Sequence, residues 1–196
     1  MRGLVLATTN HNKVREIRFL LRDRPVAVRT LADLPPIVEP EESGVTFAAN
    51  ARLKALHYAA AIPGLVVSED SGLVVDAMGG APGVYSARFL SPTATYPERF
   101  AAILQRLHGL PAAARTARFV CAVAVAEGPR LLFETTGTIE GRIADAPVGH
   151  GGFGYDPIFF NPELGATLAE AGDAKAAVSH RGRAFAALAR WLDDLE

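Results

Sequence analysis

The chain has little cysteine, no long apolar run and no excess of charge of either sign. Its one cysteine, Cys121, lies in the apolar run 119–125, so no disulfide can form within the chain, and we expect a buried thiol in a reducing cytosol. No stretch approaches the roughly 20 apolar residues that a membrane-spanning helix needs. The formal net charge of -1 gives no basic field to collect nucleic acid. These features predict a cytoplasmic protein with neither a membrane nor a nucleic acid as its partner.

The sequence does contain a clear alternation of extended and helical patterns. Hydrophobic residues make up 49% of the 196 residues, enough for a substantial core, and the length fits one domain or one body with two lobes. Thr95 followed by Glu98 is the pattern of a capping box. We expect strands at 4–7, 26–29, 65–68, 118–125 and 130–138, the last two as a hairpin, and helices at 14–21, 46–61, 95–107 and 179–195. The pattern predicts an α/β fold with a mixed sheet.

A polar loop, residues 8–13, separates the first expected strand from the first expected helix. The backbone N–H groups and the positive dipole end of a helix N-terminus attract anions, and Lys13 adds a positive charge. The glycines and the Gly-Lys-Ser/Thr ending of a Walker A loop are missing. The loop is therefore a candidate phosphate site, although polar loops of this kind commonly serve only as connections.

Carboxylates gather at two places, Glu41-Glu42 in a loop and Glu69-Asp70 after the apolar run 65–68. Ligands of α/β enzymes bind beyond the carboxyl ends of strands, where we expect Asp70 to lie. Mg²⁺ is usually held by one or two carboxylates together with substrate phosphate oxygens. Glu41 and Glu42 can equally be solvated loop charges, so Asp70 is the stronger candidate.

Two later segments suggest a base pocket. Glycines crowd residues 149–154, where the backbone can approach a flat ligand, and Phe153, Tyr155 and Asp156 add aromatic faces and an acceptor. The alternative is a tight turn with its aromatic rings in the core. Basic residues at 175–182 lie near an expected helix N-terminus, where they oppose the helix dipole. A bound anion or base carbonyl explains them, and an ordinary charged helix start is the alternative.

Several of these segments occur together, in the same order, in one family. They resemble the inosine triphosphate pyrophosphatase family, whose bacterial members are called XTP/dITP diphosphatases, and the resemblance runs nearly end to end. The matching strings are Leu6-Ala7-Thr8-Thr9-Asn10, Asp70-Ser71-Gly72-Leu73, the segment from Gly79 to Arg88, the segment from Gly151 to Pro157, and Ser179-His180-Arg181-Gly182.

The resemblance implies an elongated, two-lobed α/β fold around a long mixed sheet, with a cleft between the lobes. It implies a single catalytic domain over residues 1–196 that forms a homodimer. The implied reaction is the Mg²⁺-dependent hydrolysis of non-standard purine nucleoside triphosphates, namely ITP, dITP and XTP, to the monophosphate and pyrophosphate. A pyrophosphatase for other modified nucleotides and a nucleotide sensor without catalysis are the alternatives.

The resemblance also assigns roles by position. Asp70 would be the general base and a metal ligand, and Glu41 the second metal contact, with Glu42 as the alternative after a shift of one residue. Phosphates would be held by Thr8, Thr9, Asn10, His11, Asn12, Lys13 and Lys175, with Ser71 also touching substrate. The base would be received by Phe153, Gly154, Tyr155, Asp156, His180 and Arg181, with Asp156 facing N1–H and Arg181 the 6-carbonyl. The family commonly has Gly at the position of Thr9 and Asp at that of Glu69.

Overall fold

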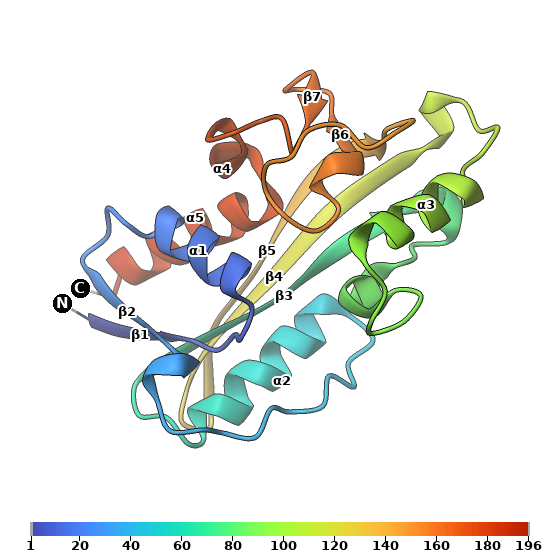
Figure 1. Cartoon of the computed structure of the whole chain (residues 1–196). Coiled ribbons are helices and arrows are strands. Elements are labelled where there is room, and N and C mark those ends of the chain that lie inside the picture. Colours follow the sequence, from blue (N-terminus) through green and yellow to red (C-terminus); the bar gives the residue numbers. More distant parts are fainter. Residues whose placement is uncertain (1, 196) are drawn as a thin grey trace. The chain divides into compact units, whose positions relative to one another are not determined.

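The computed structural model describes residues 2–195, which form two compact units (Figure 1). Unit 1 comprises residues 2–70, 121–137 and 180–195, and unit 2 comprises residues 71–120 and 138–179. Helices and strands both contribute to each unit, so the predicted α/β class is confirmed. None of the helices in residues 2–195 is long and apolar enough to cross a membrane.

One mixed sheet of seven strands, in the order β2-β1-β3-β4-β5-β6-β7, organises the chain. Strand β1 pairs in parallel with β2 and β3, whereas β6 pairs antiparallel with β5 and β7. Neighbouring strands β4 and β5 are joined by only two residues, a connection that requires an antiparallel hairpin, as the sequence predicts. The strands are β1 Arg2–Leu6, β2 Val26–Thr30, β3 Leu65–Val75, β4 Thr116–Glu127, β5 Arg130–Ile143, β6 Phe159–Asn161 and β7 Ala166–Thr167.

The helices start and end where the local sequence favours it. Thr46 caps α2 by accepting a hydrogen bond from the N–H of Ala49. Thr95 and Glu98 form the predicted capping box of α3, and Pro97 occupies its first turn, where its missing N–H costs no hydrogen bond. The α-helices are α1 His11–Leu20, α2 Phe47–Ala59, α3 Tyr96–Arg106, α4 Ala174–Val178 and α5 His180–Asp193.

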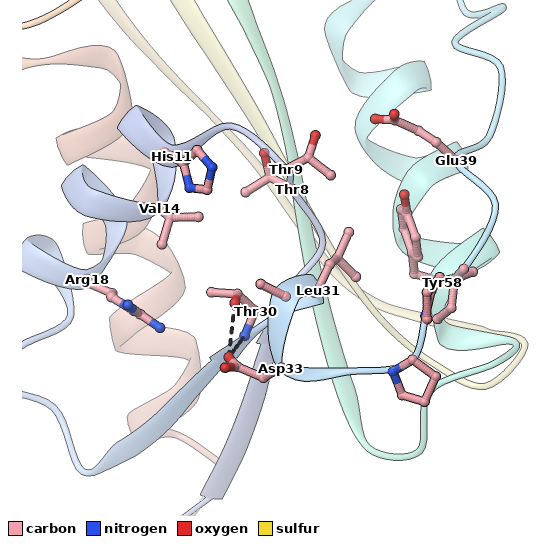
Figure 2. Close-up of a pocket in the computed structure, with 14 residues that line it drawn as sticks. Thr8, Thr9, His11, Val14, Arg18, Thr30, Leu31, Asp33, Glu39 and Tyr58 are labelled. Carbon is pink, nitrogen blue, oxygen red and sulfur yellow. Dashed lines mark hydrogen bonds between the residues drawn. The ribbon is translucent and has the colours of Figure 1, made fainter.

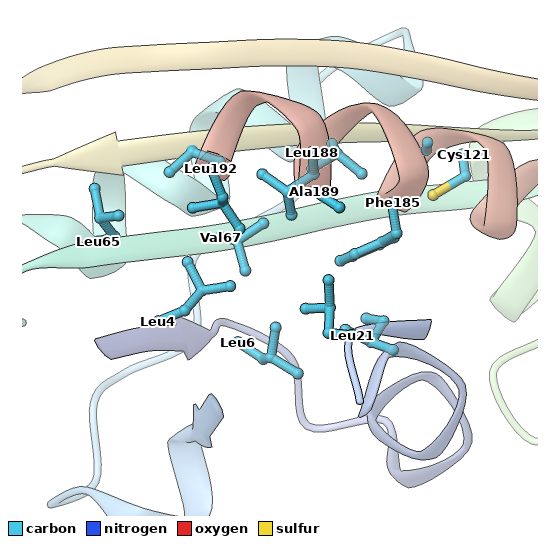
Figure 3. Close-up of a cluster of buried hydrophobic side chains, with 14 residues drawn as sticks. Leu4, Leu6, Leu21, Leu65, Val67, Cys121, Phe185, Leu188, Ala189 and Leu192 are labelled. Carbon is cyan, nitrogen blue, oxygen red and sulfur yellow. The ribbon is translucent and has the colours of Figure 1, made fainter. Parts of the chain in front are cut away.

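Alternation along the strands gives unit 1 two separate cores. Leu4 and Leu6 of β1 share one cluster with α1 and α5, and Figure 3 shows these side chains converging between the strands and α5. Val5 and Ala7, one residue out of step, share the other cluster with α2. Because successive strand residues point to opposite faces, α1 and α5 cover one face of the sheet and α2 covers the other. This rule also decides where the polar residues of β3 point.

Unit 2 has a core of its own, in which aromatic side chains are prominent. Phe119 and Phe159 have ring centroids 4.8 Å apart, and Ile103 of α3 is fully buried in the same cluster. Each unit therefore has a buried hydrophobic cluster of its own.

The prediction that Glu69 and Asp70 end a strand is wrong, since β3 continues unbroken from Leu65 to Val75. Ser71 and Gly72, which follow the expected end of the strand, are extended as well. A Cβ on Gly72 would collide with Ser86 Oγ, which accepts a hydrogen bond from the N–H of Leu73 at 2.9 Å. A partner from a later segment therefore keeps the strand straight, and Asp70 lies in mid-strand.

Candidate active site

The loop before α1 is shaped by its own side chains. Asn10 is the N-cap residue, and its Oδ1 accepts hydrogen bonds from the N–H groups of Asn12 at 3.0 Å and Lys13 at 3.2 Å. Thr8 Oγ1 in turn accepts from the N–H of Asn10 at 3.2 Å. These bonds hold the polar loop in one conformation at a helix N-terminus, where phosphate binding is favourable.

One side of this loop opens on a groove of about 590 Å³ within unit 1. Figure 2 shows Thr8, Thr9 and His11 along one wall, with Glu39 and Tyr58 across from them. The floor includes Thr30, whose N–H and hydroxyl both donate to Asp33 Oδ2. Three residues that the resemblance assigns to phosphate therefore face open space. The other lining residues are Val14, Arg18, Leu31, Ala32, Pro35, Pro36 and Ile37.

Lys13 belongs to a buried ion network centred on Glu69. Its ammonium lies 3.2 Å from Glu69 Oε1, the same oxygen that accepts from Arg181 Nε at 3.3 Å and Nη2 at 3.2 Å. Arg181 Nη1 also donates to Glu16 at 2.5 Å. Burial alone would lower the pKa of Arg181, but Glu69 and Glu16 raise it, so the guanidinium stays charged. The Glu69 and Arg181 side chains are only 1% and 2% exposed. The ion network of Lys13, Glu16, Glu69 and Arg181, called the Glu69 clamp below, is therefore part of the buried structure.

The predicted buried thiol lies beside the clamp. Cys121 is fully buried, and its Sγ lies 3.3 Å from Glu69 Oε2. Burial, followed by the charge of Glu69, raises the pKa of the Cys121 thiol well above its ordinary value. A buried thiol with a raised pKa is a poor nucleophile, as expected of a structural cysteine.

Asp70 points to the opposite face of the sheet and meets α2. Its Oδ2 accepts from Asn50 Nδ2 at 3.1 Å, and its Oδ1 lies 3.6 Å from Lys54 Nζ. Burial raises the pKa of Asp70 above its ordinary value, and this outweighs the lowering by Lys54 and Lys13. For Lys54, burial lowers the pKa, but Asp70 and Glu42 together raise it, so the ammonium stays charged. A buried carboxylate with a raised pKa is the property expected of a general base.

Glu42, and not Glu41, is connected to this carboxylate. Lys54 forms a salt bridge with Glu42 as well as with Asp70, whereas the Glu41 side chain is exposed. The geometry therefore favours Glu42, the alternative one residue along, as the partner of Asp70.

Glu42 and Asp70 are the two carboxylates of this cluster that could hold a divalent cation. The ammonium of Lys54 already occupies a position where two carboxylates, Glu42 and Asp70, stabilise a positive charge. Within residues 2–195, no cluster of three or more His, Cys, Asp or Glu could bind a metal by protein ligands alone. Two carboxylates with the remaining positions left to phosphate oxygens and water is the arrangement that Mg²⁺ commonly adopts.

The glycine-rich segment of unit 2 is organised around Asp156. Asp156 is 2% exposed, and its Oδ2 accepts from the N–H of Phe153 at 2.8 Å and from Lys175 Nζ at 2.7 Å. Gly152 has φ +69°, and a Cβ there would strike the same oxygen. Lys175 also lies 5.3 Å from the centre of the half-buried Phe153 ring. The turn therefore presents one aromatic face beside a buried Lys–Asp pair.

Tyr155 lies in the core, as the alternative interpretation of the glycine-rich turn predicted. It is 2% exposed, donates from its hydroxyl to the carbonyl of Ser86 at 2.8 Å, and packs edge-on against Tyr96. Its side chain therefore supports the turn, and Phe153 is the ring with an accessible face. Gly154 and Ser71 are half-buried in unit 2, and the buried His180 is the first residue of α5 in unit 1.

Sequence reasoning missed Asn50 and Lys54. Both lie on α2, four residues apart on one helix face, and both are at most 8% exposed among alanines. That spacing of buried polar residues on an apolar face was the available signal. Adjacent residues of one strand point to opposite faces of the sheet, so treating β3 as one strand would also have indicated that Glu69 and Asp70 have different neighbours.

A buried carboxylate flanked by a lysine and an amide, with a preshaped loop at a helix N-terminus, defines an α/β protein with a site for a phosphate-bearing ligand. The chain belongs to the Ham1 family, whose model matches residues 4–191. The resemblance drawn from the sequence is thereby confirmed.

Curated relatives cover nearly the whole chain. It is 46% identical over 189 residues to the "dITP/XTP pyrophosphatase" of Geobacillus kaustophilus, covering 96% of this chain and 93% of that one. It is 47% identical over 190 residues to the protein of the same name from Geobacter sulfurreducens, covering 96% and 95%. Solved structures agree, with a TM-score of 0.87 and 38% identity to a HAM1 protein from Coxiella burnetii, covering 99% and 100% of the two chains. The Staphylococcus aureus Ham1 protein gives 0.88 and 34%, covering both chains fully.

Proposed function

We propose that this chain hydrolyses dITP, ITP and XTP to the nucleoside monophosphate and pyrophosphate, which removes non-standard purines from the nucleotide pool. The observation that carries the proposal is the buried Asp70 carboxylate with its raised pKa, held by Asn50 and Lys54. The dITP/XTP pyrophosphatase names of relatives at 46% and 47% identity supply the substrate class.

Asp70 is the general base of the proposed reaction. It accepts a proton from a water molecule, whose oxygen attacks the α-phosphorus while the bond to the pyrophosphate oxygen breaks. Lys13 and Lys54 supply positive charge to the phosphate chain, and the amides at the start of α1 add hydrogen-bond donors. Asp70 and Glu42 would hold Mg²⁺, which would neutralise negative charge on the phosphate oxygens.

Base recognition is assigned to the Asp156 turn, with Phe153 stacking on the ring. ITP and XTP carry N1–H and a 6-carbonyl, whereas ATP carries a bare N1 and an amino group. A site whose polar groups pair with N1–H and the 6-carbonyl of ITP or XTP leaves those buried groups unpaired when ATP binds. The resulting ratio of kcat/KM values can reach about 10⁴ in favourable cases. Asp156 offers the acceptor for N1–H, and Lys175, which the resemblance assigns to phosphate, donates to its Oδ2. The donors of Arg181 are directed at Glu69 and Glu16, so its contact with the base stays a prediction, as do the homodimer and the cytoplasmic location.

A substrate panel tests this proposal. Pyrophosphate release is measured with ITP, dITP, XTP, GTP, ATP and a pyrimidine triphosphate, each with Mg²⁺ and with EDTA, for the wild type and for Asp70→Asn. We expect turnover of the first three with Mg²⁺, little turnover of ATP, and a loss of orders of magnitude in kcat for the variant. Equal turnover of ATP and ITP would refute the assigned selectivity, and preference for a pyrimidine would favour a broader pyrophosphatase. Full activity of the variant would remove Asp70 from the mechanism.

A further inference from the structure

A line of polar residues runs along the otherwise alanine-rich α2. Asn50, Lys54 and His57 follow one another at spacings of four and three residues, which places them on one helix face. Each meets a different part of the loop 36–46: Asn50 meets Gly44, Lys54 meets Glu42, and His57 Nε2 lies 2.7 Å from the carbonyl of Val38. This face of α2 therefore holds the acidic loop along its length.

Asn50, like Lys54, contacts both the loop and the candidate general base Asp70, but it does so through an uncharged amide. Its side chain is fully buried, with Nδ2 donating to Asp70 Oδ2 at 3.1 Å and Oδ1 accepting from the N–H of Gly44 at 2.8 Å. A Cβ on Gly44 would come within 2.5 Å of that Oδ1, so the loop backbone lies as close to Asn50 as glycine allows. One uncharged amide thus joins the loop that carries Glu42 to the carboxylate on β3.

We propose that Asn50 is a positioning residue that fixes the rotation of the Asp70 carboxylate and ties the Glu42 loop to it. The proposal rests on the proposed function, because it assigns Asn50 an effect on the turnover that Asp70 performs. With Oδ2 engaged by Asn50, Oδ1 is the oxygen turned toward Lys54, at 3.6 Å. An amide suits this role because it satisfies a buried carboxylate with a hydrogen bond and leaves its negative charge available for accepting a proton.

Two substitutions separate the two bonds. Asn50→Asp keeps an oxygen acceptor for Gly44 N–H but replaces the donor to Asp70, whereas Asn50→Leu removes both at similar volume. We expect both variants to lower kcat about 100-fold, because small misplacements of a reacting group cost that much, with KM for ITP within about threefold of wild type. Asn50→Leu alone is expected to release the loop, seen as cleavage after Glu41 or Glu42 by a glutamate-specific protease about tenfold faster than in the wild type.

Asn161 provides a matched control. It is 1% exposed in unit 2, donates from Nδ2 to the carbonyl of Glu140 at 3.0 Å and accepts at Oδ1 from the N–H of Leu164 at 3.0 Å. Asn161→Asp and Asn161→Leu therefore remove equivalent buried bonds away from Asp70. They are expected to lower the melting temperature about as much as the Asn50 variants and to leave kcat within about twofold of wild type.

The outcomes decide between positioning and a merely structural role. The proposal is overturned if the Asn50 and Asn161 variants lose kcat equally, or if the Asn50 variants raise KM with kcat unchanged. A wild type that does not turn over ITP defeats the proposed function instead. In that case crystal structures of the wild type and Asn50→Asp decide, and an unchanged orientation of the Asp70 carboxylate overturns the inference, whereas a rotated carboxylate supports it.

Discussion

At the scale of single residues, the adjacent carboxylates Glu69 and Asp70 of β3 have different roles because successive strand residues point to opposite faces of the sheet. Glu69 faces α1 and α5 and neutralises Lys13 and Arg181, whereas Asp70 faces α2 and contacts Asn50 and Lys54. Glu69 forms ion pairs with the half-buried Lys13 and the buried Arg181. Asp70 keeps a raised pKa because burial exceeds the effect of its cationic neighbours. Neighbours in the sequence therefore have separate roles.

The pH dependence of turnover follows from the direction of the Asp70 shift. A base works only when unprotonated, and burial raises the pKa of Asp70, so kcat/KM should fall with decreasing pH through a midpoint above the ordinary value of an aspartate. Lys54 lowers the pKa of Asp70, so Lys54→Met should raise it further and move this acid limb to higher pH. The measurement is a pH profile of kcat/KM on ITP for both proteins. A limb that moves to lower pH in the variant would contradict this electrostatic account.

The Glu69 clamp makes a prediction about stability. Glu69→Gln keeps the shape of the side chain but removes the charge that Arg181 and Lys13 share, so the buried guanidinium loses one of its anionic partners. Removing one member of a buried ion pair costs about 3 kcal/mol, and we expect a loss of that order in urea unfolding. Glu16→Gln, at a side chain 20% exposed, should cost less. Wild-type stability in Glu69→Gln would show that the clamp contributes nothing to the fold.

Sequence patterns identified the residues whose chemistry is evident from their type and flanks, such as Lys13, Asp70 and Asp156. They could not identify Asn50, because an asparagine within an alanine-rich helix has no chemical signature until its partner on β3 is known. The burial of Tyr155 was also undetermined, since aromatic residues in a glycine-rich turn suit a core and a ligand equally well.

At the scale of secondary-structure elements, local signals predicted the hairpin and four of the five α-helices in residues 2–195, but not the short α4. The capping box at Thr95 and the N-cap at Thr46 depend on residues three apart, so they can be recognised without tertiary information. Strand β3 could not be predicted as one element, because Ser71-Gly72 resembles a turn and the group that keeps it extended, Ser86, lies in a later segment. Local rules were sufficient where the hydrogen-bond partners are local.

The capping box gives a stability prediction for α3. Thr95→Ala removes the acceptor for the Glu98 N–H and the hydroxyl that donates to Glu98 Oε2, which should cost about 1 kcal/mol. The melting temperature should fall by about 3 °C for a protein of this size, with kcat on ITP unchanged. Thr93→Ala, at an exposed residue before the helix, serves as the control and should melt like the wild type. An equal loss in the two variants would show that the box adds nothing.

At the scale of the whole molecule, the two units share three strands of the sheet. Strands β3, β4 and β5 each begin in one unit and end in the other, and the residues of each unit come from two or three stretches of the sequence. Contiguous patterns of apolar residues therefore could not predict this division, because no linker or change in composition marks it.

The shared strands predict one unfolding transition. Leu188→Ala in the core of unit 1 and Ile103→Ala in the core of unit 2 each remove a fully buried side chain, at a cost of about 3 kcal/mol. Because neither unit can lose β3, β4 or β5 without disrupting the other, both variants should lower a single melting temperature, measured by calorimetry. Two resolved transitions, with only one shifted in each variant, would show that the units unfold independently.

The most direct test of the central claim is to follow ITP with the enzyme and Mg²⁺ by ³¹P NMR. Attack of the activated water on the α-phosphorus predicts that IMP and inorganic pyrophosphate appear together, with no IDP at any time. The appearance of IDP with orthophosphate, or an ITP spectrum that stays unchanged, would contradict the account.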